Sequence, residues 1–374
     1  MRLVVTGGGT GGHIYPAVAV AKEMVHLLPR ASVLYVGTEV GMESRLVPKE
    51  GLPFKAVRSS GVMGKSPSQA VKGLVRASLG VLDALAILRE FRPDVVLGTG
   101  GYASGPVMAA SFLLGIPRAI QEQNAVPGKT NLWLSRISHR TFAAWDYSVR
   151  FFPARSRVVV TGNPVRRDIF EDAPKRDCRK FFGMSEEGPA VLLLGGSRGA
   201  RTLVEAGIEI ARKMPPEWSM LFVTGAEYFP EACRSLGVSP SDGIDGIRAG
   251  NIILKPYVYE MARAYGAADL VIGRAGGMTL AEITALGLPA VIVPSPNVAG
   301  NHQEFNARAL EEEGAALVVR EGPGAASRIA ETALGLLGDP KRLARLSGES
   351  RRVGKREATA VICRHLIDLA GRKG

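Results

Sequence analysis

Cysteine is scarce in this chain of 374 residues, with only Cys178, Cys233 and Cys363 and no CxxC pair among them. Disulfide frameworks and structural zinc sites need more cysteines at closer spacing, so both are excluded, and the composition fits a reducing compartment. Long apolar runs are also lacking, since the longest, around residues 107–116, is about half of what a bilayer crossing needs. No basic and then apolar signal segment precedes the first expected strand. We therefore expect a protein that is soluble or peripherally attached to a membrane.

Several motifs that carry chemistry are absent as well. The sequence has no GxxxxGK[ST] phosphate loop, no DxD motif, no GxSxG elbow and no His, Cys or carboxylate group at metal-ligand spacing. A bound diphosphate would have to be held by helix N-termini and by Arg or Ser side chains. No metal and no cofactor is expected.

Glycine, in contrast, is abundant, with 45 of the 374 residues against a usual ~7%. No collagen-like period accompanies it, so the excess predicts tight turns where the backbone comes close to a ligand or another element.

Positive charge is in excess and unevenly placed. The net charge of +12 divides into +10 for residues 1–160, −5 for 161–340 and +7 for 341–374. A basic half attracts polyanions, meaning nucleic acid, anionic lipid headgroups or phosphorylated substrates. Aromatic residues are only 6% and no RNA-binding motif is present, so we do not expect a nucleic-acid partner.

Short apolar runs alternate with helical patterns, which is typical of parallel α/β sheets covered on both faces. The expected strands are residues 3–6, 33–37, 54–57, 95–98, 118–121, 141–143, 191–194, 220–224, 252–255, 270–273, 290–293 and 316–319.

The two halves resemble each other. LVVTGGGTGG (3–12) matches VLLLGGSRGA (191–200), DVVLGTGG (94–101) matches DLVIGRAGG (269–277), and LGIPRAI (114–120) matches LGLPAVI (286–292). We predict two Rossmann-like domains in tandem that face a cleft, with ligands at the carboxyl ends of the strands.

The glycine-rich turn at residues 7–12 lies between a strand and an expected helix from Pro16 to Leu28. Its glycines permit close backbone approach, and the helix start favours negative charge. His13 stands at the mouth of this turn, where its side chain can face the cleft or simply cap the helix.

Four other segments could belong to a site. GGSRGA (195–200) is the matching turn of the second half, and RAGGMTLAE (274–282) places a carboxylate one turn into a helix. QEQN (121–124) and NHQE (301–304) place polar side chains where strands end. A structural turn, a compensated helix dipole or an exposed loop is the alternative for each.

Seven motifs in order along residues 3 to about 320 resemble those of the peptidoglycan glycosyltransferases that add N-acetylglucosamine to lipid I. They are GGGTGGHIYPAVAVA, DVVLGTGGYASGP, QEQN, TGNPVR, GGSRGA, RAGGMTLAE and NHQEFNA. The resemblance implies an α/β fold of the B-type glycosyltransferase class. It also implies an inverting transfer from UDP-N-acetylglucosamine to the 4-hydroxyl of N-acetylmuramoyl-pentapeptide on undecaprenyl diphosphate, giving lipid II.

By this similarity residues 1–162 form the acceptor-binding and membrane-docking domain and residues 163–340 the UDP-sugar domain. Residues 341–374 form a basic helical tail that packs back on the first domain. The implied donor-binding residues are Thr10, Gly11, Gly12, Asn124, Arg166, Ser197, Val258, Gly277, Met278, Thr279, Glu282 and Gln303. Arg198 stands where glutamine is common in the family, and His302, before Gln303, stands where another glutamine can occur.

An inverting transfer needs a base for the acceptor hydroxyl and stabilisation of the departing UDP. His13 is the candidate base because a neutral imidazole titrates near working pH, and Glu122 is the alternative. Tyr102 and Ser104 are candidates for holding the acceptor diphosphate.

The lipid acceptor implies a peripheral enzyme on the cytoplasmic side of the cell membrane, bound to an anionic surface. Other cell-wall synthesis proteins are candidate partners. We expect a helix that begins after Ser66 and ends near Phe91, with Leu79, Lys72 and Arg76 at the interface. A wholly buried helix is the alternative.

Three other functions fit parts of the pattern. A different UDP-sugar transferase or epimerase would share the fold. An NAD(P)-dependent dehydrogenase would use residues 7–12 and Glu39 but would leave the second glycine turn and Glu282 without a role. A basic nucleic-acid-binding protein would explain only the charge.

Overall fold

The computed structural model describes residues 1–59, 67–153, 158–171, 173–196, 199–239 and 246–371, and for residues 67–75 and 299 it describes the backbone only. The chain divides into two compact units. The first contains Met1–Arg166 and Lys355–Gly374, and the second contains Arg167–Gly354. The boundary thus falls four residues after the expected one at residue 162.

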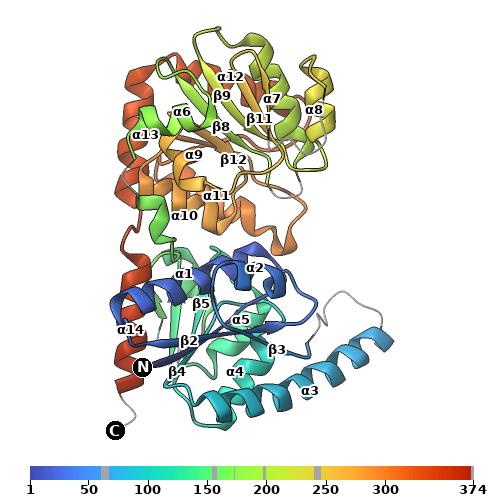
Figure 1. Ribbon diagram of the computed structural model, residues 1–374, viewed down its shortest axis with the longest axis vertical. Helices are drawn as coiled ribbons and strands as arrows, with labels where there is room; N and C mark the ends of the chain where they lie inside the picture. Colours follow the sequence, from blue (N-terminus) through green and yellow to red (C-terminus); the bar gives the residue numbers. More distant parts are fainter. Residues whose placement is uncertain (60–66, 154–157, 172, 197–198, 240–245, 372–374) are drawn as a thin grey trace. The chain divides into compact units, whose positions relative to one another are not determined.

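The first unit is built on a parallel sheet with the strand order β3-β2-β1-β4-β5-β6-β7 (Figure 1). Its strands are β1 (Arg2–Thr6), β2 (Ser32–Thr38), β3 (Phe54–Val57), β4 (Val95–Gly98), β5 (Arg118–Glu122), β6 (Arg140–Ala143) and β7 (Val158–Val160). Its helices are α1 (Gly11–Leu27), α2 (Glu43–Lys49), α3 (Pro67–Phe91), α4 (Ser104–Leu113), α5 (Lys129–Ser135), the 3₁₀ turn η1 (Asp146–Phe151) and α14 (Ala358–Gly371). This strand order, which reverses between β1 and β4, is that of a dinucleotide-binding fold.

Alternate residues of these strands enter two cores, one on each face of the sheet. Leu3 and Val5 of β1 pack with α1 and α14 on one face. Val4, between them, packs with α3 and α4 on the other face. This double burial explains why the strands are continuous apolar runs in the sequence.

The second unit has the strand order β10-β11-β9-β8-β12-β13-β14, parallel except for the antiparallel pair β10–β11. Its strands are β8 (Ala190–Leu194), β9 (Ser219–Val223), β10 (Ile247–Ala249), β11 (Ile252–Lys255), β12 (Leu270–Gly273), β13 (Ala290–Ile292) and β14 (Leu317–Val318). Its helical segments are η2 (Arg167–Phe170), α6 (Lys175–Phe182), α7 (Arg201–Lys213), α8 (Phe229–Ser235), α9 (Met261–Ala267), α10 (Gly277–Leu286), η3 (Ala299–Asn301), α11 (His302–Glu312), α12 (Ala325–Leu337) and α13 (Pro340–Val353).

Every expected strand is confirmed to within one residue at either end, and the tandem Rossmann-like architecture is confirmed with them. The short edge strands β7 and β10 were not predicted. β10 pairs by only three residues in a hairpin with β11, which is too short a run to show periodicity.

The expectation for the start of α1 was wrong. The helix begins at Gly11 and not at Pro16, so Pro16 lies inside it and His13 lies in its first turn. The early glycines mask the helical pattern in the sequence, because glycine is a poor helix former.

The expected tail of residues 341–374 is two helices that belong to different units. α13 packs in the second unit, where Leu346 is buried in the core and the Ser347 hydroxyl donates to Gly287 O at 2.6 Å. α14 packs in the first unit, where Ile362, Cys363 and Leu366 are fully buried against α1.

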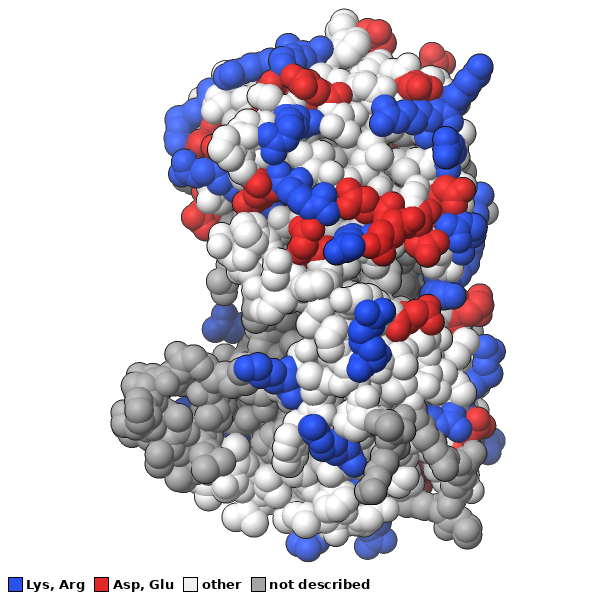
Figure 2. Space-filling model, turned by 180° about the vertical axis from the view of Figure 1, so that it is seen from behind, with Lys and Arg blue, Asp and Glu red and all other residues white. Residues whose placement is uncertain are grey.

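The charge asymmetry of the sequence is visible on the surface. Figure 2 shows Asp and Glu side chains gathered beside Lys and Arg on the second unit, and mostly Lys and Arg among uncharged side chains on the first. Among the helices of the described residues, none has both the length and the apolarity to cross a bilayer.

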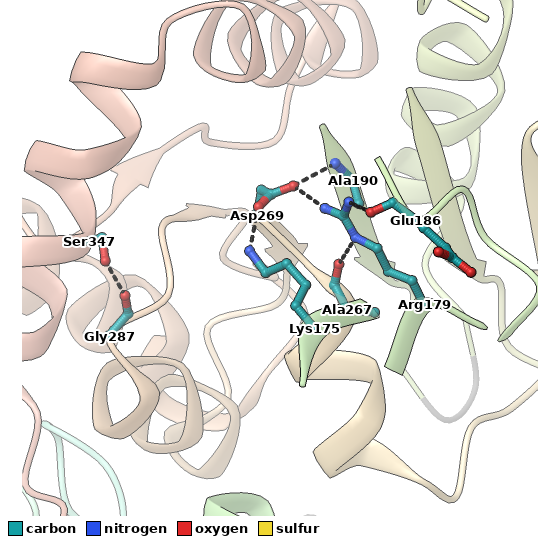
Figure 3. Close-up of polar contacts among 8 residues, drawn as sticks. All are labelled: Lys175, Arg179, Glu186, Ala190, Ala267, Asp269, Gly287 and Ser347. Atoms are coloured by element: carbon teal, nitrogen blue, oxygen red, sulfur yellow. Dashed lines mark hydrogen bonds and ion pairs between the residues drawn. The ribbon is translucent and has the colours of Figure 1, made fainter. Parts of the chain in front are cut away.

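One polar network joins the amino ends of β8 and β12 in the second unit (Figure 3). The buried Arg179 guanidinium donates to Asp269 Oδ2 at 2.7 Å, to Ala267 O at 3.1 Å and to Glu186 O at 2.9 Å. The same carboxylate accepts from Ala190 N at 2.8 Å and from Lys175 Nζ at 2.6 Å. The network thus compensates a buried charge at the edge of the sheet opposite the glycine turns.

We predict that Asp269→Ala lowers the free energy of unfolding of the second unit by about 3–5 kcal/mol, because it leaves the buried Arg179 charge without its carboxylate. Trp218 is the only tryptophan of that unit, so denaturant unfolding can be followed by its fluorescence with Trp133 and Trp145 replaced by Phe. Glu313→Ala, which removes an exposed ion pair with Arg352, is the control and should leave the midpoint nearly unchanged. Equal midpoints for the two variants would contradict the role given to Asp269.

Candidate active site

Two glycine turns meet at the carboxyl ends of β1 and β4 in the first unit. Gly8 N donates to Gly100 O at 3.3 Å, and a Cβ on Gly101 would lie only 2.0 Å from Gly8 O. Gly101 also has a φ of +76°, which side-chain-bearing residues rarely adopt. Only glycine therefore permits this backbone contact.

The contact sets His13 beside the second turn. His13 Nδ1 lies 3.1 Å from Thr99 O and 3.0 Å from Gln123 Oε1. The backbone is held as well, since Thr99 Oγ1 lies 2.6 Å from His13 O. A Cβ on Gly100 would lie 3.0 Å from the imidazole, so this glycine makes room for the ring.

The polar segment after β5 lies against His13. Gln121 and Gln123 are buried, and Gln123 Nε2 donates to Thr99 O at 2.7 Å and to Gln121 Oε1 at 2.6 Å. Asn163, from the TGNPVR segment, donates to Gln123 O at 2.9 Å. The sequence predicts these side chains at the edge of a site. In the structure they are buried and form a hydrogen-bond network next to the His13 imidazole.

The structure does not place Glu122, the predicted alternative to His13 as the base, where its carboxylate could meet a substrate. Its side chain is only 1% exposed. One carboxylate oxygen accepts from the backbone and side-chain nitrogens of Asn124 at 2.9 and 3.2 Å. The other accepts from Gly128 N at 3.1 Å and Asn131 Nδ2 at 2.8 Å. These bonds organise the loop of residues 123–128, Asn124 included, and supply no accessible lone pair for a substrate hydroxyl.

Tyr102 and Ser104, the two residues predicted to hold the acceptor diphosphate, differ in how far they are buried. Ser104 is fully buried, accepts from Gly100 N at 3.1 Å and lies 2.8 Å from Gly100 O, so it holds the turn from inside. Tyr102 is half-buried with its ring against Gly9. Tyr102 is therefore better placed than Ser104 for a ligand contact.

Glu43 supports the first turn and was not predicted. This fully buried carboxylate accepts from Gly9 N at 3.2 Å and from the backbone and hydroxyl of Thr38 at 3.1 and 2.6 Å. Burial, and secondarily the Glu43 charge, raises the pKa of the Tyr35 hydroxyl, which donates to Gly7 O at 2.9 Å. Only its position just after a buried strand could have signalled this role.

The start of α1 is open to solvent, with Thr10 and Gly12 exposed and Gly11 half-buried. Arg166 lies near it, with the guanidinium carbon 5.8 Å from the centre of the Tyr15 ring. Arg166 belongs to the first unit, although the sequence placed it with the donor residues of the second.

In the second unit α10 begins directly after the Gly276 N-cap, so its first-turn backbone amides point out of the start of the helix. Gly277 is buried there, whereas Met278 and Thr279 are half-buried. Glu282, one turn later, accepts from the Tyr265 hydroxyl at 2.8 Å. The Tyr265 side chain is 2% exposed, so this bond gives the carboxylate a fixed orientation.

The other expected donor residues lie around this sheet edge. Val258 is buried in the loop between β11 and α9, and Gln303 Oε1 accepts from Ser295 N at 2.9 Å after β13. Arg274 donates to Val293 O at 3.2 Å and pairs with Glu321 at 2.5 Å. Ser197 and Arg198 lie outside the described residues. Among the residues that are described, no group of His, Cys, Asp or Glu is arranged to hold a metal ion.

Comparison with known proteins matches both units to family models. Residues 3–143 match the glycosyltransferase family 28 N-terminal domain and residues 190–362 match its C-terminal domain. The chain is 42% identical, over all of its length and 99% of the relative's, to the UDP-N-acetylglucosamine–N-acetylmuramyl-(pentapeptide) pyrophosphoryl-undecaprenol N-acetylglucosamine transferase of Desulforudis audaxviator. It is 40% identical to the protein of the same name from Symbiobacterium thermophilum, over 99% of this chain and 96% of that one.

Solved structures give the same architecture. The crystal structure of MurG from Acinetobacter baumannii superposes with a TM-score of 0.74 at 27% identity, covering 98% of this chain and 99% of that one. A UDP-GlcNAc 2-epimerase from Neisseria meningitidis gives 0.67 at 16% identity over 98% and 100% of the two chains, which is a likeness of fold alone.

Proposed function

The chain belongs to glycosyltransferase family 28, and we propose that it transfers N-acetylglucosamine from UDP-N-acetylglucosamine to N-acetylmuramyl-pentapeptide pyrophosphoryl-undecaprenol. The observation that carries this function is the full-length identity of about 40% to enzymes that bear the name of this reaction. The transfer is to the 4-hydroxyl of the acceptor sugar with inversion, and it gives lipid II and UDP.

The direct test is UDP release by the purified enzyme. We expect release only when UDP-N-acetylglucosamine and a lipid I analogue are both present, and a disaccharide product in equal amount. An epimerase of the same fold would instead convert the donor without any acceptor, and that result would overturn the proposal.

We assign the donor to the second unit. The ribose hydroxyls donate to Glu282, which Tyr265 holds in place, and the uracil meets the backbone at Val258. The diphosphate lies at the start of α10, at Gly277, Met278 and Thr279, where the helix dipole favours negative charge. The further residues that the family resemblance assigns to donor contacts are Ser197, Arg166, Gln303 and Asn124, with Thr10, Gly11 and Gly12 assigned to the sugar.

The assigned base is His13. A neutral imidazole takes the proton of the attacking hydroxyl, while helix N-termini and Arg166 receive the charge that develops on the departing UDP. The geometry favours His13 over Glu122, since the Glu122 carboxylate is buried and bonded to its own loop. Tyr102 and the backbone of the second glycine turn hold the acceptor diphosphate, with Ser104 supporting the turn from inside.

We assign membrane docking to a surface of the first unit made by α3, α4 and α5, which we call the α3–α5 face. Large exposed apolar side chains gather on these three packed helices: Leu82, Phe112, Leu113 and Trp133. Arg76 is exposed on α3, and Arg136 is exposed directly after the end of α5. Leu79, expected at the interface, is half-buried, and Leu82 takes the outward position. The Lys72 side chain lies outside the described residues.

Exposed apolar side chains accompanied by exposed basic ones suit the surface of an anionic bilayer. Docking there gives the enzyme access to an acceptor whose undecaprenyl chain stays in the membrane. The three cysteines are free and buried, which agrees with a position on the cytoplasmic side.

Glu282→Ala should weaken UDP binding by about 1–3 kcal/mol, the scale of hydrogen bonds to a charged group. Titration calorimetry with UDP measures the loss. Glu187→Ala, an exposed carboxylate of the same unit, is the matched control and should bind UDP as the unaltered enzyme does. An unchanged dissociation constant for Glu282→Ala would remove this residue from the site.

His13→Ala should lower kcat by roughly 10²–10⁴-fold with UDP affinity nearly unchanged, because general base catalysis contributes on that scale. Steady-state kinetics with a soluble lipid I analogue gives kcat, and His139→Ala, an exposed histidine of the same unit, is the control. A loss of less than about tenfold would assign the base to another group.

Glutamate at both Arg76 and Arg136 should weaken binding to anionic vesicles about 30-fold or more at low salt, since each basic residue near such a surface contributes roughly 1 kcal/mol. Activity on a short-chain soluble acceptor should remain. Arg212→Glu with Arg234→Glu, both exposed in the second unit, is the control. Unchanged vesicle binding by the first pair would transfer the docking role to another surface, such as the basic C-terminal segment.

A further inference from the structure

A chain of buried side-chain amides ends at the imidazole of His13. Asn163 Oδ1 accepts from Gln121 Nε2 at 2.8 Å, Gln121 Oε1 accepts from Gln123 Nε2 at 2.6 Å, and Gln123 Oε1 lies 3.0 Å from His13 Nδ1. The three amide side chains are at most 3% exposed. Water therefore does not compete for these bonds.

Backbone carbonyls fix the direction of each amide, because a carbonyl can only accept. Gln121 Nε2 donates to Glu122 O at 3.0 Å, Gln123 Nε2 donates to Thr99 O at 2.7 Å, and Asn163 Nδ2 donates to Gln123 O at 2.9 Å. A flipped amide at any of these positions would bring two oxygens together. Gln123 must therefore present its oxygen, and not its nitrogen, to His13.

The imidazole consequently faces two acceptors at Nδ1, Gln123 Oε1 and the carbonyl of Thr99 at 3.1 Å. A lone pair at Nδ1 would repel both, so the neutral ring carries its proton there. Nε2 then carries the lone pair, and within the described residues it makes no hydrogen bond.

We propose that Gln123 is a positioning residue that holds His13 in the Nδ1-protonated tautomer, with Gln121 and Asn163 fixing its amide. The proposal rests on the proposed function, in which His13 is the base. In the transfer, Nε2 takes the hydroxyl proton as the acceptor oxygen bonds to the anomeric carbon. The bond from that carbon to the UDP oxygen breaks, and its electron pair leaves with UDP. The imidazolium that forms has its Nδ1 proton on two acceptors, which stabilises it.

Among the described residues on the segments around His13, no charged or titratable group accepts a hydrogen bond from its Nδ1. The Glu122 carboxylate is bonded to Asn124, Gly128 and Asn131. The Tyr102 ring packs on Gly9, and Arg166 lies over Tyr15. The tautomer thus depends on neutral amides, which orient the ring without adding charge.

Imidazole ¹⁵N NMR of the unaltered, histidine-labelled enzyme tests the tautomer directly. We expect a protonated Nδ1 and an unprotonated Nε2 for His13 at high pH, assigned by loss of its signals in His13→Ala. His139 is an internal reference with the opposite tautomer. Its neutral ring carries the proton on Nε2, because its Nδ1 accepts from Arg118 N. A protonated Nε2 at His13 would overturn the proposal.

Gln123→Met and Gln123→Glu test the role in turnover. Gln123→Met removes the acceptor at nearly constant volume and should lower kcat about 10- to 100-fold with the KM for UDP-N-acetylglucosamine unchanged. Gln123→Glu keeps an oxygen at Nδ1 but replaces the Nε2 donor by an oxygen that faces Thr99 O and Gln121 Oε1, so it should retain only part of kcat. Its acidic limb in the pH profile should lie at higher pH, because a carboxylate stabilises the imidazolium. Normal kcat in Gln123→Met, or a Glu variant with no shift of that limb, would overturn the proposal.

The same experiments distinguish the role proposed for Gln123 from the assignment of His13 as the base. If His13→Ala is inactive while Gln123→Met keeps both activity and the Nδ1-protonated signal, the role of Gln123 is refuted and His13 remains the base. If His13→Ala keeps its activity, the assignment of the base fails, whatever tautomer the NMR spectra show.

Discussion

The contact between two glycine turns is the constraint on which the first unit's site depends. Gly8 and Gly101 bring the backbones after β1 and β4 so close that a single methyl group would displace one of them. This contact starts α1 at Gly11, puts His13 in its first turn and brings Thr99 O within reach of the imidazole. Glu43 and Ser104, both buried, hold the two turns from behind.

The second unit uses the same strand–turn–helix arrangement for a different purpose. Its α10 begins at the second glycine of the pair Gly276–Gly277, and the side chain one turn later is the carboxylate Glu282, oriented by the buried Tyr265. One unit therefore has an imidazole in the first turn of a helix, and the other has an oriented carboxylate near the start of a helix. The two side chains follow non-equivalent strands, since β1 corresponds to β8 and β4 to β12 in the two strand orders.

The sequence predicts the fold well because buried parallel strands leave a strong local signal. Continuous apolar runs such as β4 and β12 were located to the residue. The start of α1 was missed because glycine and Pro16 conceal a helix that tertiary contacts impose. The division of the C-terminal segment between α13 and α14 depends on which core each helix completes, and no local pattern records that.

Site residues were predictable as motifs but not as roles. QEQN was recognised as polar and near the site, yet only the structure shows that Gln123 touches His13 while Glu122 is bonded to its own loop. Such roles depend on side-chain direction, which a one-residue alternation along β5 decides. Glu43 has no motif around it, so its support of Gly9 follows only from three-dimensional packing.

A crystal structure with bound UDP-N-acetylglucosamine tests the central claim most directly, namely that the donor binds in the second unit and the base stands in the first. The account predicts the uracil against the backbone at Val258, the ribose hydroxyls on Glu282 and the diphosphate at the start of α10. A nucleotide bound instead at residues 7–12 of the first unit would contradict it, because the turn that carries His13 would then hold the donor.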